Sequence, residues 1–364
     1  MSGPPRVLHV ARDWVRPSEG FVADVVRAST RTTPTVAYGR SWPGSTPAVP
    51  ATDLTALARR LTLSEGDRAL RAALRLTVHR RRAALLHSHF GYWAHLVAAV
   101  ARRTGRPWTV AVHGHDVLVE GDRHGVLPSA ALVVVPSRFL GEGVVRLGVE
   151  PSRLRVVPSG LDLSTLPFRE RSARPDGSVV VTFAGRYVAK KGVLDATAAF
   201  AAARQELPGL AFRFVGHGPQ EADLSALLER LRLPAELVDG SRPGAVRAAL
   251  AGTDLLVTAS REAPDGDAET LGLVNLEAHA CGVPLVSTAT GGVPEAVCAE
   301  AATLVPEGDT AALAAALVQL ARSPESWAAR GRAGRAHVER HFDLRDRVAE
   351  LEELWLDLLR TAAP

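Results

Sequence analysis

Short apolar runs alternate with longer segments of helical spacing along the first half of the chain. The run PRVLHVA precedes the polar loop RDWVRPSEG, and helical spacing follows in FVADVVRAST. The runs ALLHSHF, WTVAVHG, ALVVVPS and RLRVVPSG repeat this order. Continuous apolar runs are typical of strands buried in a parallel sheet, and their alternation with helices indicates right-handed βαβ units. Residues 51–82 interrupt the alternation with Arg-rich helical connections.

The apolar pattern stops at residues 166–178 and then restarts. Pro, Arg, Gly and Ser dominate LPFRERSARPDGS, which predicts a linker between two domains. After it, the expected strands SVVVTFAG, LAFRFVGHG, LLVTAS and PLVSTATGG alternate with helices such as VLDATAAFAAARQE. We therefore predict an α/β protein with two doubly wound, Rossmann-like domains, residues 1–165 and 179–345, facing each other across a cleft.

The C-terminal segment, residues 346–364, has the spacing of an amphipathic helix. Its apolar side chains recur every three or four positions at Val348, Leu351, Leu354, Trp355 and Leu358. An apolar stripe of this kind needs a surface to cover. We expect the helix to pack back on the N-terminal domain.

Composition narrows the class of protein. The chain has 364 residues, of which 46% are hydrophobic and 23% charged, as in ordinary globular proteins. No apolar run approaches the roughly 18 residues that span a bilayer, and the N-terminal apolar run is too short for a signal peptide. Cys281 and Cys298 are too few for a disulfide framework. We expect a soluble, cytoplasmic protein.

Charge is distributed unevenly between the two halves. Residues 1–165 hold 22 arginines against 12 acidic residues, whereas the remainder holds 21 basic and 27 acidic residues. A basic half favours anionic partners, such as phosphorylated acceptors or the anionic inner face of a membrane. Solvated faces of Arg-rich helices explain the surplus equally well. Nothing in the pattern indicates a nucleic-acid partner.

The two lysines of the chain are adjacent. Lys190 and Lys191 lie in GRYVAKKG, residues 185–192, and the other 41 basic residues are arginines. A GC-rich genome accounts for the bias in general. The local exception indicates a need for a compact ammonium, which acts as a point charge against phosphate, where guanidinium is a flat fork.

Two glutamates lie eight residues apart in ETLGLVNLE. A helix is expected to begin near Gly272 or Leu273, which places Glu269 in the preceding loop and Glu277 about one turn inside the helix. Backbone N–H groups at such a helix start favour an anion. The nearby carboxylates are suited to accept the hydroxyls of a sugar and of a ribose.

The segment ETLGLVNLEAHACGVP (residues 269–284) resembles the Glu-x7-Glu segment of family 4 glycosyltransferases, which have the GT-B fold. GRYVAKKG matches the Gly-Arg … Lys-Gly segment of that family. The further matches are VHGHD (112–116), VPSGLD (157–162), VGHGP (215–219) and TGGVPE (290–295). They follow the family order over residues 6–340. The loop PSEGF (17–21) resembles a subgroup related to exopolysaccharide and aminoglycoside-type sugar transferases, although Gly20 stands where Thr is usual.

The resemblance implies a bacterial-type retaining glycosyltransferase that needs no metal or other cofactor. Such an enzyme moves a hexose-type sugar from a nucleoside-diphosphate sugar, with UDP-sugar favoured, to a hydroxyl of a glycan, a lipid-linked acceptor or a natural product. Water would be excluded by closure of the domains. Retention implies front-face attack, in which the leaving phosphate helps to deprotonate the acceptor.

The resemblance also assigns roles to individual residues. The diphosphate is assigned to Arg186 and Lys191, supported by the backbone N–H groups of Leu271 and Gly272. Glu269 and His113 are assigned to the transferred sugar, and Glu277 to the ribose. Lys190 is expected to be a solvated neighbour. The remaining assignments are Gly216, Gly218 and Arg242 for the base, and Ser18, Glu19 and Gly20 for the acceptor.

Other chemistries stay open. The pairs His87/His89 and His113/His115 could suggest a metal site, but they lack a clear spacing to further ligands. Asp265 and Asp267 resemble the Asp-x-Asp metal motif of a different glycosyltransferase architecture, and we interpret them as loop acids. The remaining candidates are an epimerase or a non-glycosidic coupling enzyme on the same fold, and a degenerate partner subunit. An NAD oxidoreductase has only the incomplete fingerprint Gly216-His-Gly218 in its favour.

Overall fold

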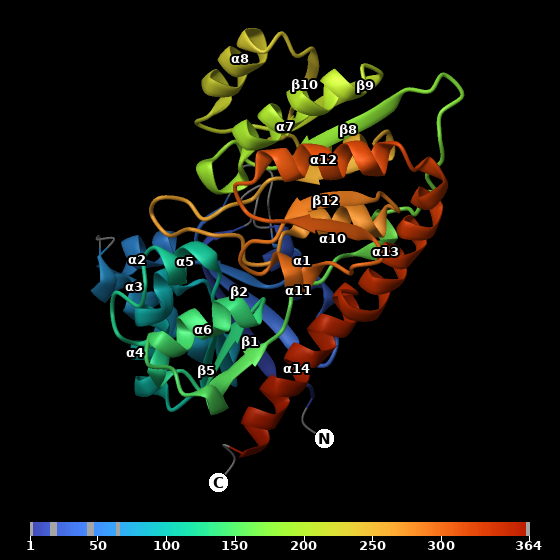
Figure 1. The fold of residues 1–364 in the computed structure, drawn as a ribbon. Helices are drawn as coiled ribbons and strands as arrows, with labels where there is room; N and C mark the ends of the chain where they lie inside the picture. The colour runs from blue at the N-terminus through green and yellow to red at the C-terminus, as the bar shows by residue number, and fades with distance from the viewer. Residues whose placement is uncertain (1–2, 15–19, 42–46, 63–65, 362–364) are drawn as a thin grey trace. The chain divides into compact units, whose positions relative to one another are not determined.

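The computed structural model describes residues 3–14, 20–41, 47–62 and 66–361 (Figure 1). The chain divides into two compact units. The first comprises residues up to Gly160 together with the segment from Leu344 onward, and the second comprises Leu161–Asp343. In the described residues, no helix is both long and apolar enough to span a membrane.

The first unit is built on a parallel sheet. Its strands, in the order of the sheet, are β3 (Ala51–Asp53), β2 (Thr33–Ser41), β1 (Arg6–Trp14), β4 (Leu85–His89), β5 (Trp108–Ala111), β6 (Leu132–Val135) and β7 (Leu154–Val156). Its helices are α1 (Gly20–Ala28), α2 (Leu54–Thr62), α3 (Asp67–Arg81), α4 (Ala94–Thr104), α5 (Gly114–Leu118), α6 (Arg138–Arg146) and α14 (Leu344–Thr361). The strand order reverses between β1 and β4, which is the doubly wound arrangement.

Both faces of this sheet are buried, as the continuous apolar runs predict. On β1, Leu8 and Val10 pack into the core under α3 and α4. Val7, on the opposite face, packs into a second core with residues of α14. The interrupted stretch 51–82 forms β3, α2 and α3, so it contributes an edge strand as well as the two expected helices.

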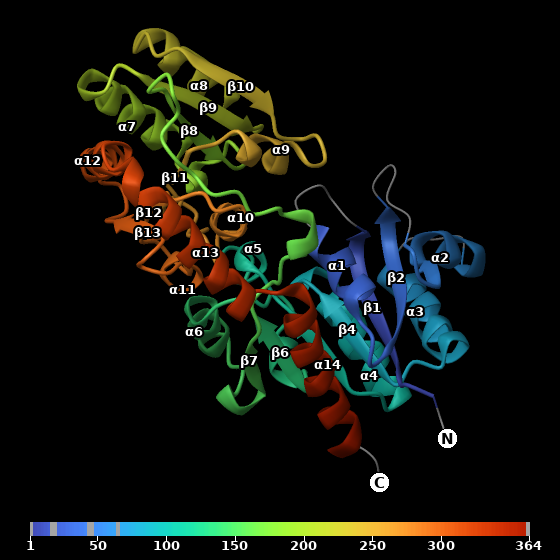
Figure 2. The same ribbon diagram turned by 90° about the vertical axis from the view of Figure 1, so that its right-hand side faces the viewer.

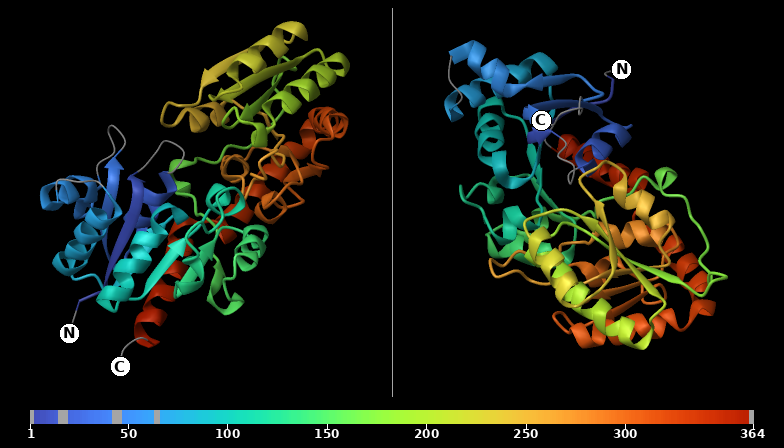
Figure 3. Two further views of the ribbon diagram at one scale, coloured as in Figure 1. Left: turned by 90° about the vertical axis from the view of Figure 1, so that its left-hand side faces the viewer. Right: turned by 90° about the horizontal axis from the view of Figure 1, so that it is seen from above.

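The last helix, α14, lies against the sheet of the first unit (Figures 2 and 3). Trp355 on its apolar stripe is fully buried. Glu352 lies on the same side and is also fully buried, which the apolar spacing did not predict. Its carboxylate accepts hydrogen bonds from the backbone N–H groups of Thr30, Arg31 and Thr32 at 2.8–3.1 Å. Those donors replace water around the buried side chain and join α14 to the turn after α1.

The second unit repeats the architecture. Its strands, in sheet order, are β10 (Ala235–Asp239), β9 (Leu210–Gly216), β8 (Val179–Ala184), β11 (Leu255–Thr258), β12 (Leu285–Thr288) and β13 (Ala302–Val305), all parallel. Its helices are α7 (Val193–Glu206), α8 (Glu221–Arg230), α9 (Ala245–Ala251), α10 (Leu273–Ala280), α11 (Val293–Ala296), α12 (Thr310–Ala321) and α13 (Trp327–His341). Helices α7 and α12 cover one face, and α10 and α13 lie on the other (Figure 1).

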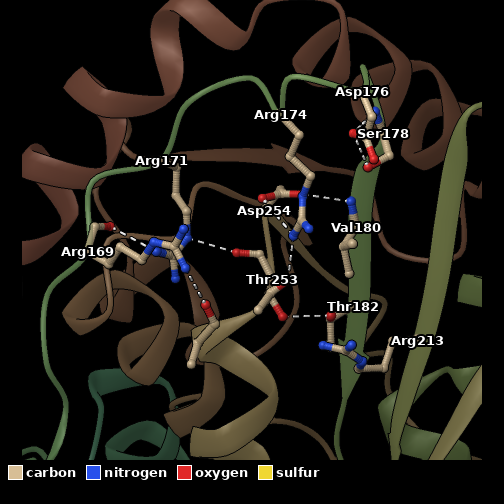
Figure 4. Close-up of polar contacts among 12 residues, drawn as sticks. Arg169, Arg171, Arg174, Asp176, Ser178, Val180, Thr182, Arg213, Thr253 and Asp254 are labelled. Carbon is tan, nitrogen blue, oxygen red and sulfur yellow. Dashed lines mark hydrogen bonds and ion pairs between the residues drawn. The ribbon is translucent and has the colours of Figure 1, made fainter.

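The segment predicted as a linker, residues 166–178, belongs to the second unit and is fixed there by arginines (Figure 4). Arg171 is buried and donates to the carbonyl oxygens of Leu250 and Thr253, both at 2.8 Å. Arg174 pairs with Asp254 at 2.6 Å. Because guanidinium offers five donors in a fixed fork, one side chain satisfies several carbonyls at once. The Pro- and Arg-rich composition therefore reflects anchoring to the α9–β11 connection.

Candidate functional site

The strand order of the second sheet reverses between β8 and β11, and a small cavity lies at that point. Ligands of doubly wound sheets bind outside the carboxyl ends of the strands at such a reversal. The cavity is lined by Phe183 and Ala184 at the end of β8, and by Thr258 at the end of β11. Lys191, Ser260, Glu269, Gly272, Val274 and Asn275 complete the lining. Three of the predicted site residues, Lys191, Glu269 and Gly272, are thus brought together.

A short 3-10 turn, Ala189–Lys191, carries both lysines and ends at Gly192. Gly192 has φ +62°, and a Cβ there would lie 1.9 Å from the carbonyl oxygen of Ala259. Only glycine permits this approach between the turn and the segment after β11. The close packing places the Lys191 ammonium against the carboxylate of Glu269, with which it forms a mostly buried ion pair.

Glu269 is ionised although it is buried. Burial raises the pKa of this carboxyl, but the ammonium of Lys191, followed by Lys190 and the backbone N–H of Gly272, lowers it to about 2. The N–H of Gly272, assigned from the sequence to the diphosphate, donates to Glu269 here. The site therefore presents a paired cation and carboxylate at the head of α10.

Lys190 is also buried, so the prediction of a solvated side chain is wrong. It is only 9% exposed, and its ammonium lies 2.9 Å from a carboxylate oxygen of Asp267. The two lysines therefore pair with two acids that are themselves two residues apart. Asp265 belongs to the same loop as Asp267, and its carboxylate accepts a hydrogen bond from the backbone N–H of Asp267 at 3.1 Å.

Buried polar groups fix the base of the cavity. The hydroxyl of Thr258 lies 3.0 Å from the side-chain oxygen of Asn275 and 2.7 Å from the hydroxyl of Ser287. These bonds join β11, α10 and β12. The backbone carbonyl of Glu269 accepts from the N–H of Gly292 at 2.8 Å. The TGGVPE segment, residues 290–295, thus supports the loop that carries Glu269.

Glu277 lies within α10, in its second turn, and does not line this cavity. Burial raises the pKa of its carboxyl to about 7, while the guanidinium of Arg247 on α9 acts in the opposite direction. A carboxyl with this pKa changes its charge near neutral pH. Its assignment to a ribose stays a prediction.

The turns after β8 and β9 are joined by their backbones. The N–H of Gly185 donates to Val215 at 3.0 Å, and the N–H of Tyr187 donates to His217 at 2.9 Å. A Cβ on Gly216 would lie 2.0 Å from the carbonyl oxygen of Gly185, so the approach requires glycine. Gly218 packs on the backbone of Tyr187 in the same way. Arg186 is exposed in the turn after β8, and Arg242 is exposed 3.6 Å from Asp239.

His113 belongs to the first unit, at the start of α5. Its ring packs against Phe21 and Phe90, with ring centroids 4.8 and 4.6 Å away. Burial lowers the pKa of its imidazole to about 4, so the ring is neutral at pH 7. Its Nε2 is buried without a hydrogen-bond partner in the described residues. Gly20 begins α1, whereas Ser18 and Glu19 lie outside the described residues.

Asp116 holds the backbone at this position. Its carboxylate accepts from the N–H of His113 at 2.7 Å and from the N–H of Gly91 at 2.6 Å. Burial raises the pKa of Asp116 to about 7 despite these bonds. His113 also lines an apolar cavity of about 50 Å³ between α1, α14 and the carboxyl ends of β4 to β7.

His87 and His89 belong to a buried cluster that also contains His9, a residue without any signal in the sequence. His9 and His89 share a hydrogen bond of 3.0 Å, and His87 bonds the hydroxyl of Thr109 at 2.7 Å. Burial lowers the pKa of all three rings. Among the described residues, no three His, Cys, Asp or Glu side chains are placed to hold a metal ion. His115 is exposed, and its Nε2 lies 3.8 Å from a carboxylate oxygen of Glu120.

Two family profiles match successive parts of the chain. The profile described as Glycosyltransferase Family 4 matches residues 8–165, and the profile described as Glycosyl transferases group 1 matches residues 165–337. One relative is WcaL of Salmonella typhimurium, whose name describes a putative colanic acid biosynthesis glycosyltransferase. It is 35% identical to this chain over 183 residues. That match covers 48% of this chain and 44% of WcaL, so it spans less than half of that relative.

A longer match is found in Mycolicibacterium smegmatis. Its GDP-mannose-dependent α-(1-6)-phosphatidylinositol monomannoside mannosyltransferase is 31% identical over 278 residues, which cover 71% of this chain and 72% of that protein. Among solved structures, Anabaena HepE in complex with UDP-glucose superposes with a TM-score of 0.76 at 18% identity. The superposition covers 97% of this chain and 99% of HepE, and it supports the similarity of fold.

Proposed function

The chain belongs to glycosyltransferase family 4 and has the GT-B fold, and we propose that it transfers a hexose-type sugar from a nucleoside-diphosphate sugar to an acceptor hydroxyl with retention of configuration and without a metal ion. One observation carries the proposal: the Lys191 ammonium and the Glu269 carboxylate form an ion pair in the cavity where β8 and β11 separate. A sugar phosphate offers an anion and hydroxyl donors side by side, and the two groups match both.

The diphosphate takes Lys191 away from Glu269 in this proposal. The β-phosphate gains negative charge as its bond to the anomeric carbon breaks, and a positioned cation stabilises that charge. Arg186, which is exposed after β8, supplies a second cation. Glu269, released from Lys191, accepts hydrogen bonds from sugar hydroxyls. Because these groups supply the positive charge, the proposed reaction needs no divalent metal.

Retention follows from attack on the face that the phosphate leaves. The acceptor oxygen forms its bond to the anomeric carbon while the bond to the phosphate oxygen breaks, and the leaving phosphate takes the acceptor proton. Glu269 is not the nucleophile in this scheme, since its role is to bind hydroxyls. His113, whose ring is neutral at pH 7, is proposed to contact the transferred sugar. Glu277 is proposed to bind the ribose.

The donor is proposed to be a UDP-sugar, and GDP-mannose is the alternative. The bound UDP-glucose of HepE supports the first, and the GDP-mannose dependence in the mycobacterial relative's name supports the second. The acceptor is proposed to bind the first unit, whose surplus of arginine favours a phosphorylated or lipid-linked acceptor. We propose that the enzyme acts in the cytoplasm, with the basic unit able to contact an anionic membrane surface.

A binding screen followed by product analysis tests this function. The full chain is titrated with UDP, GDP, UDP-glucose and GDP-mannose, and the preferred donor is then incubated with candidate acceptors. The expected result is micromolar binding of one nucleotide-sugar and a product whose anomeric configuration, read by NMR, equals that of the donor. Inverted configuration would contradict the retaining mechanism. Failure of all four compounds to bind would contradict the donor assignment.

A further inference from the structure

Both lysines of the chain are used in neighbouring ion pairs, Lys190 with Asp267 and Lys191 with Glu269. We propose that Lys190 and Asp267 are positioning residues for the donor sugar. Their ion pair holds the loop of residues 261–272 on the turn of residues 189–192, so that Glu269 keeps its place when Lys191 leaves it for the diphosphate. This inference rests on the proposed function.

Backbone and side chain of Lys190 both contact the loop. Its carbonyl oxygen accepts from the N–H of Arg261 at 2.9 Å, at the beginning of the loop. Its ammonium lies 2.9 Å from Asp267, six residues further along. Asp267 is fixed within the loop as well, because its carbonyl accepts from the N–H of Ala263 at 2.8 Å. One lysine thus connects both arms of the loop to the turn after β8.

The pair Lys191–Glu269 cannot perform this task during the reaction. In the proposed function the two residues separate when the donor binds. The Lys191 ammonium then binds the phosphate, and the Glu269 carboxylate binds the sugar hydroxyls. A loop attached to the turn by this pair alone would lose its attachment when the donor binds. The pair Lys190–Asp267 has no such competing partner on the donor, so it remains intact.

Burial explains why the residue is lysine in a chain that otherwise uses arginine. Lys190 is 9% exposed, and its side chain reaches a single carboxylate oxygen. An arginine in the same place would bring five N–H donors, and those without partners would carry a desolvation penalty. An ammonium is compact and needs fewer partners. The lysine is therefore the basic residue that fits this position.

Four variants of the full chain separate positioning from stability. Lys190→Met removes the ammonium that pairs with the mostly buried side chain of Asp267, which lowers the melting temperature as well as displacing the loop. The double variant Lys190→Met/Asp267→Leu removes both charges, so it is expected to regain stability without regaining the attachment. Lys191→Met removes the other ammonium of the same turn. Arg322→Met removes the cation of the exposed pair Arg322–Glu206 and is the control.

Kinetics and hydrogen exchange are measured on all four. We expect kcat/KM for the donor to fall about 10- to 100-fold in Lys190→Met and to stay low in the double variant, because small displacements of a positioned group cost up to about 10² in rate. Affinity for the free nucleoside diphosphate should change less than about twofold. Amide exchange in residues 262–272 should accelerate in both Lys190 variants, and remain as in the wild type in Lys191→Met and Arg322→Met.

Two results would overturn the inference. One is unchanged exchange of residues 262–272 in Lys190→Met. The other is a double variant that regains melting temperature and activity together, which would mean that the pair only stabilises the fold. A wild-type protein that transfers no sugar, but whose loop still loosens in the Lys190 variants, would contradict the proposed function and leave the attachment of the loop supported.

Discussion

The Lys191 ammonium and the Glu269 carboxylate neutralise each other in the structure, although they come from opposite sides of the reversal in strand order of the second unit. Burial raises the pKa of the Glu269 carboxyl, but the Lys191 ammonium lowers it to about 2, because opposite charges reduce the cost of burying each other. In the proposed function, the diphosphate displaces Glu269 from the Lys191 ammonium. This competition connects the affinity for the diphosphate with the state of the carboxylate, and it leads to predictions that differ from those for two independent residues.

Loss of the Lys191 ammonium should weaken the stabilisation of the transition state, and it also leaves the buried Glu269 carboxylate without this ion pair. We expect Lys191→Ala to lower kcat/KM by about 10² or more, since one cation near the departing phosphate disappears. Steady-state kinetics with the preferred donor provide the measurement. The matched control is Arg322→Ala, which removes an exposed cation from the same unit and should retain full activity. Equal activity of the two variants would remove Lys191 from the donor site.

The raised pKa of Glu277 leads us to predict that nucleotide affinity depends on pH. Its pKa is raised to about 7, so the group is mostly protonated at pH 6 and mostly ionised at pH 8. In its proposed role the ionised form accepts both hydroxyls of a ribose, and affinity for the free diphosphate should therefore rise about tenfold from pH 6 to pH 8. Calorimetry at several pH values tests this. Glu277→Gln should bind more weakly at pH 8 and should lose the Glu277 component of the slope. A slope equal to that of the wild type would assign the titration to another group.

The burial of His279 leads us to predict that the folded protein loses stability in acid. It is buried on α10, its ring nitrogens have no hydrogen-bond partner within the described residues, and burial lowers its pKa to about 3. The unfolded chain binds a proton below pH 6.5 and the folded chain does not. The stabilisation by neutral His279 is therefore complete above pH 6.5 and is lost as the pH falls towards 3.

The variant His279→Leu isolates this contribution from those of the other buried groups. The free energy of unfolding should fall between pH 7 and pH 5 in both proteins. The fall in His279→Leu should be smaller than the fall in the wild type by about 2 kcal/mol. Urea denaturation at the two pH values gives the difference. Parallel losses in wild type and variant would show that the protonation of His279 does not contribute.

Metal removal tests whether protein side chains or a metal ion supply the positive charge at the diphosphate. Exhaustive treatment with EDTA should leave the rate of transfer unchanged, because Lys191 and Arg186 are proposed to take the place of a divalent ion. The rate is compared before and after addition of Mg²⁺ or Mn²⁺. A rate that is lost with EDTA and restored by the metal would contradict this prediction and make Asp265 and Asp267 candidate ligands.

Periodicity was sufficient to predict both parallel sheets, because a strand buried on two faces must be apolar throughout. It was not sufficient for contacts between residues far apart in the sequence. Lys190 and Asp267 are 77 positions apart, and His9 and His89 are 80 apart. Their pairing depends on which strands become neighbours when the strand order reverses. Glu352 was missed for a related reason, since its partners belong to a turn more than 300 residues earlier.

The family resemblance predicts roles for Lys191 and Glu269, and the structure adds that the two side chains form an ion pair with each other. It also changes the expectation for Lys190. A pattern of charges along the chain does not distinguish a solvated lysine from one buried against an acid, because burial is decided by the loop that folds over it. In the sequence, the two lysines stood out only because the chain has no others. That signal did not distinguish the role of Lys190 from that of Lys191.

The most direct test of the account is the affinity of Glu269→Ala for a free nucleoside diphosphate and for the corresponding nucleotide-sugar, measured by calorimetry. Removal of the carboxylate frees Lys191, so the diphosphate should bind as tightly as to the wild type or up to about tenfold more tightly. The nucleotide-sugar should lose its advantage over the free diphosphate, and single-turnover transfer should slow by about 10² or more. If Glu269→Ala instead abolishes diphosphate binding, while Glu277→Ala leaves it intact, the donor lies in the opposite orientation and the assignment of Lys191 and Glu269 is wrong.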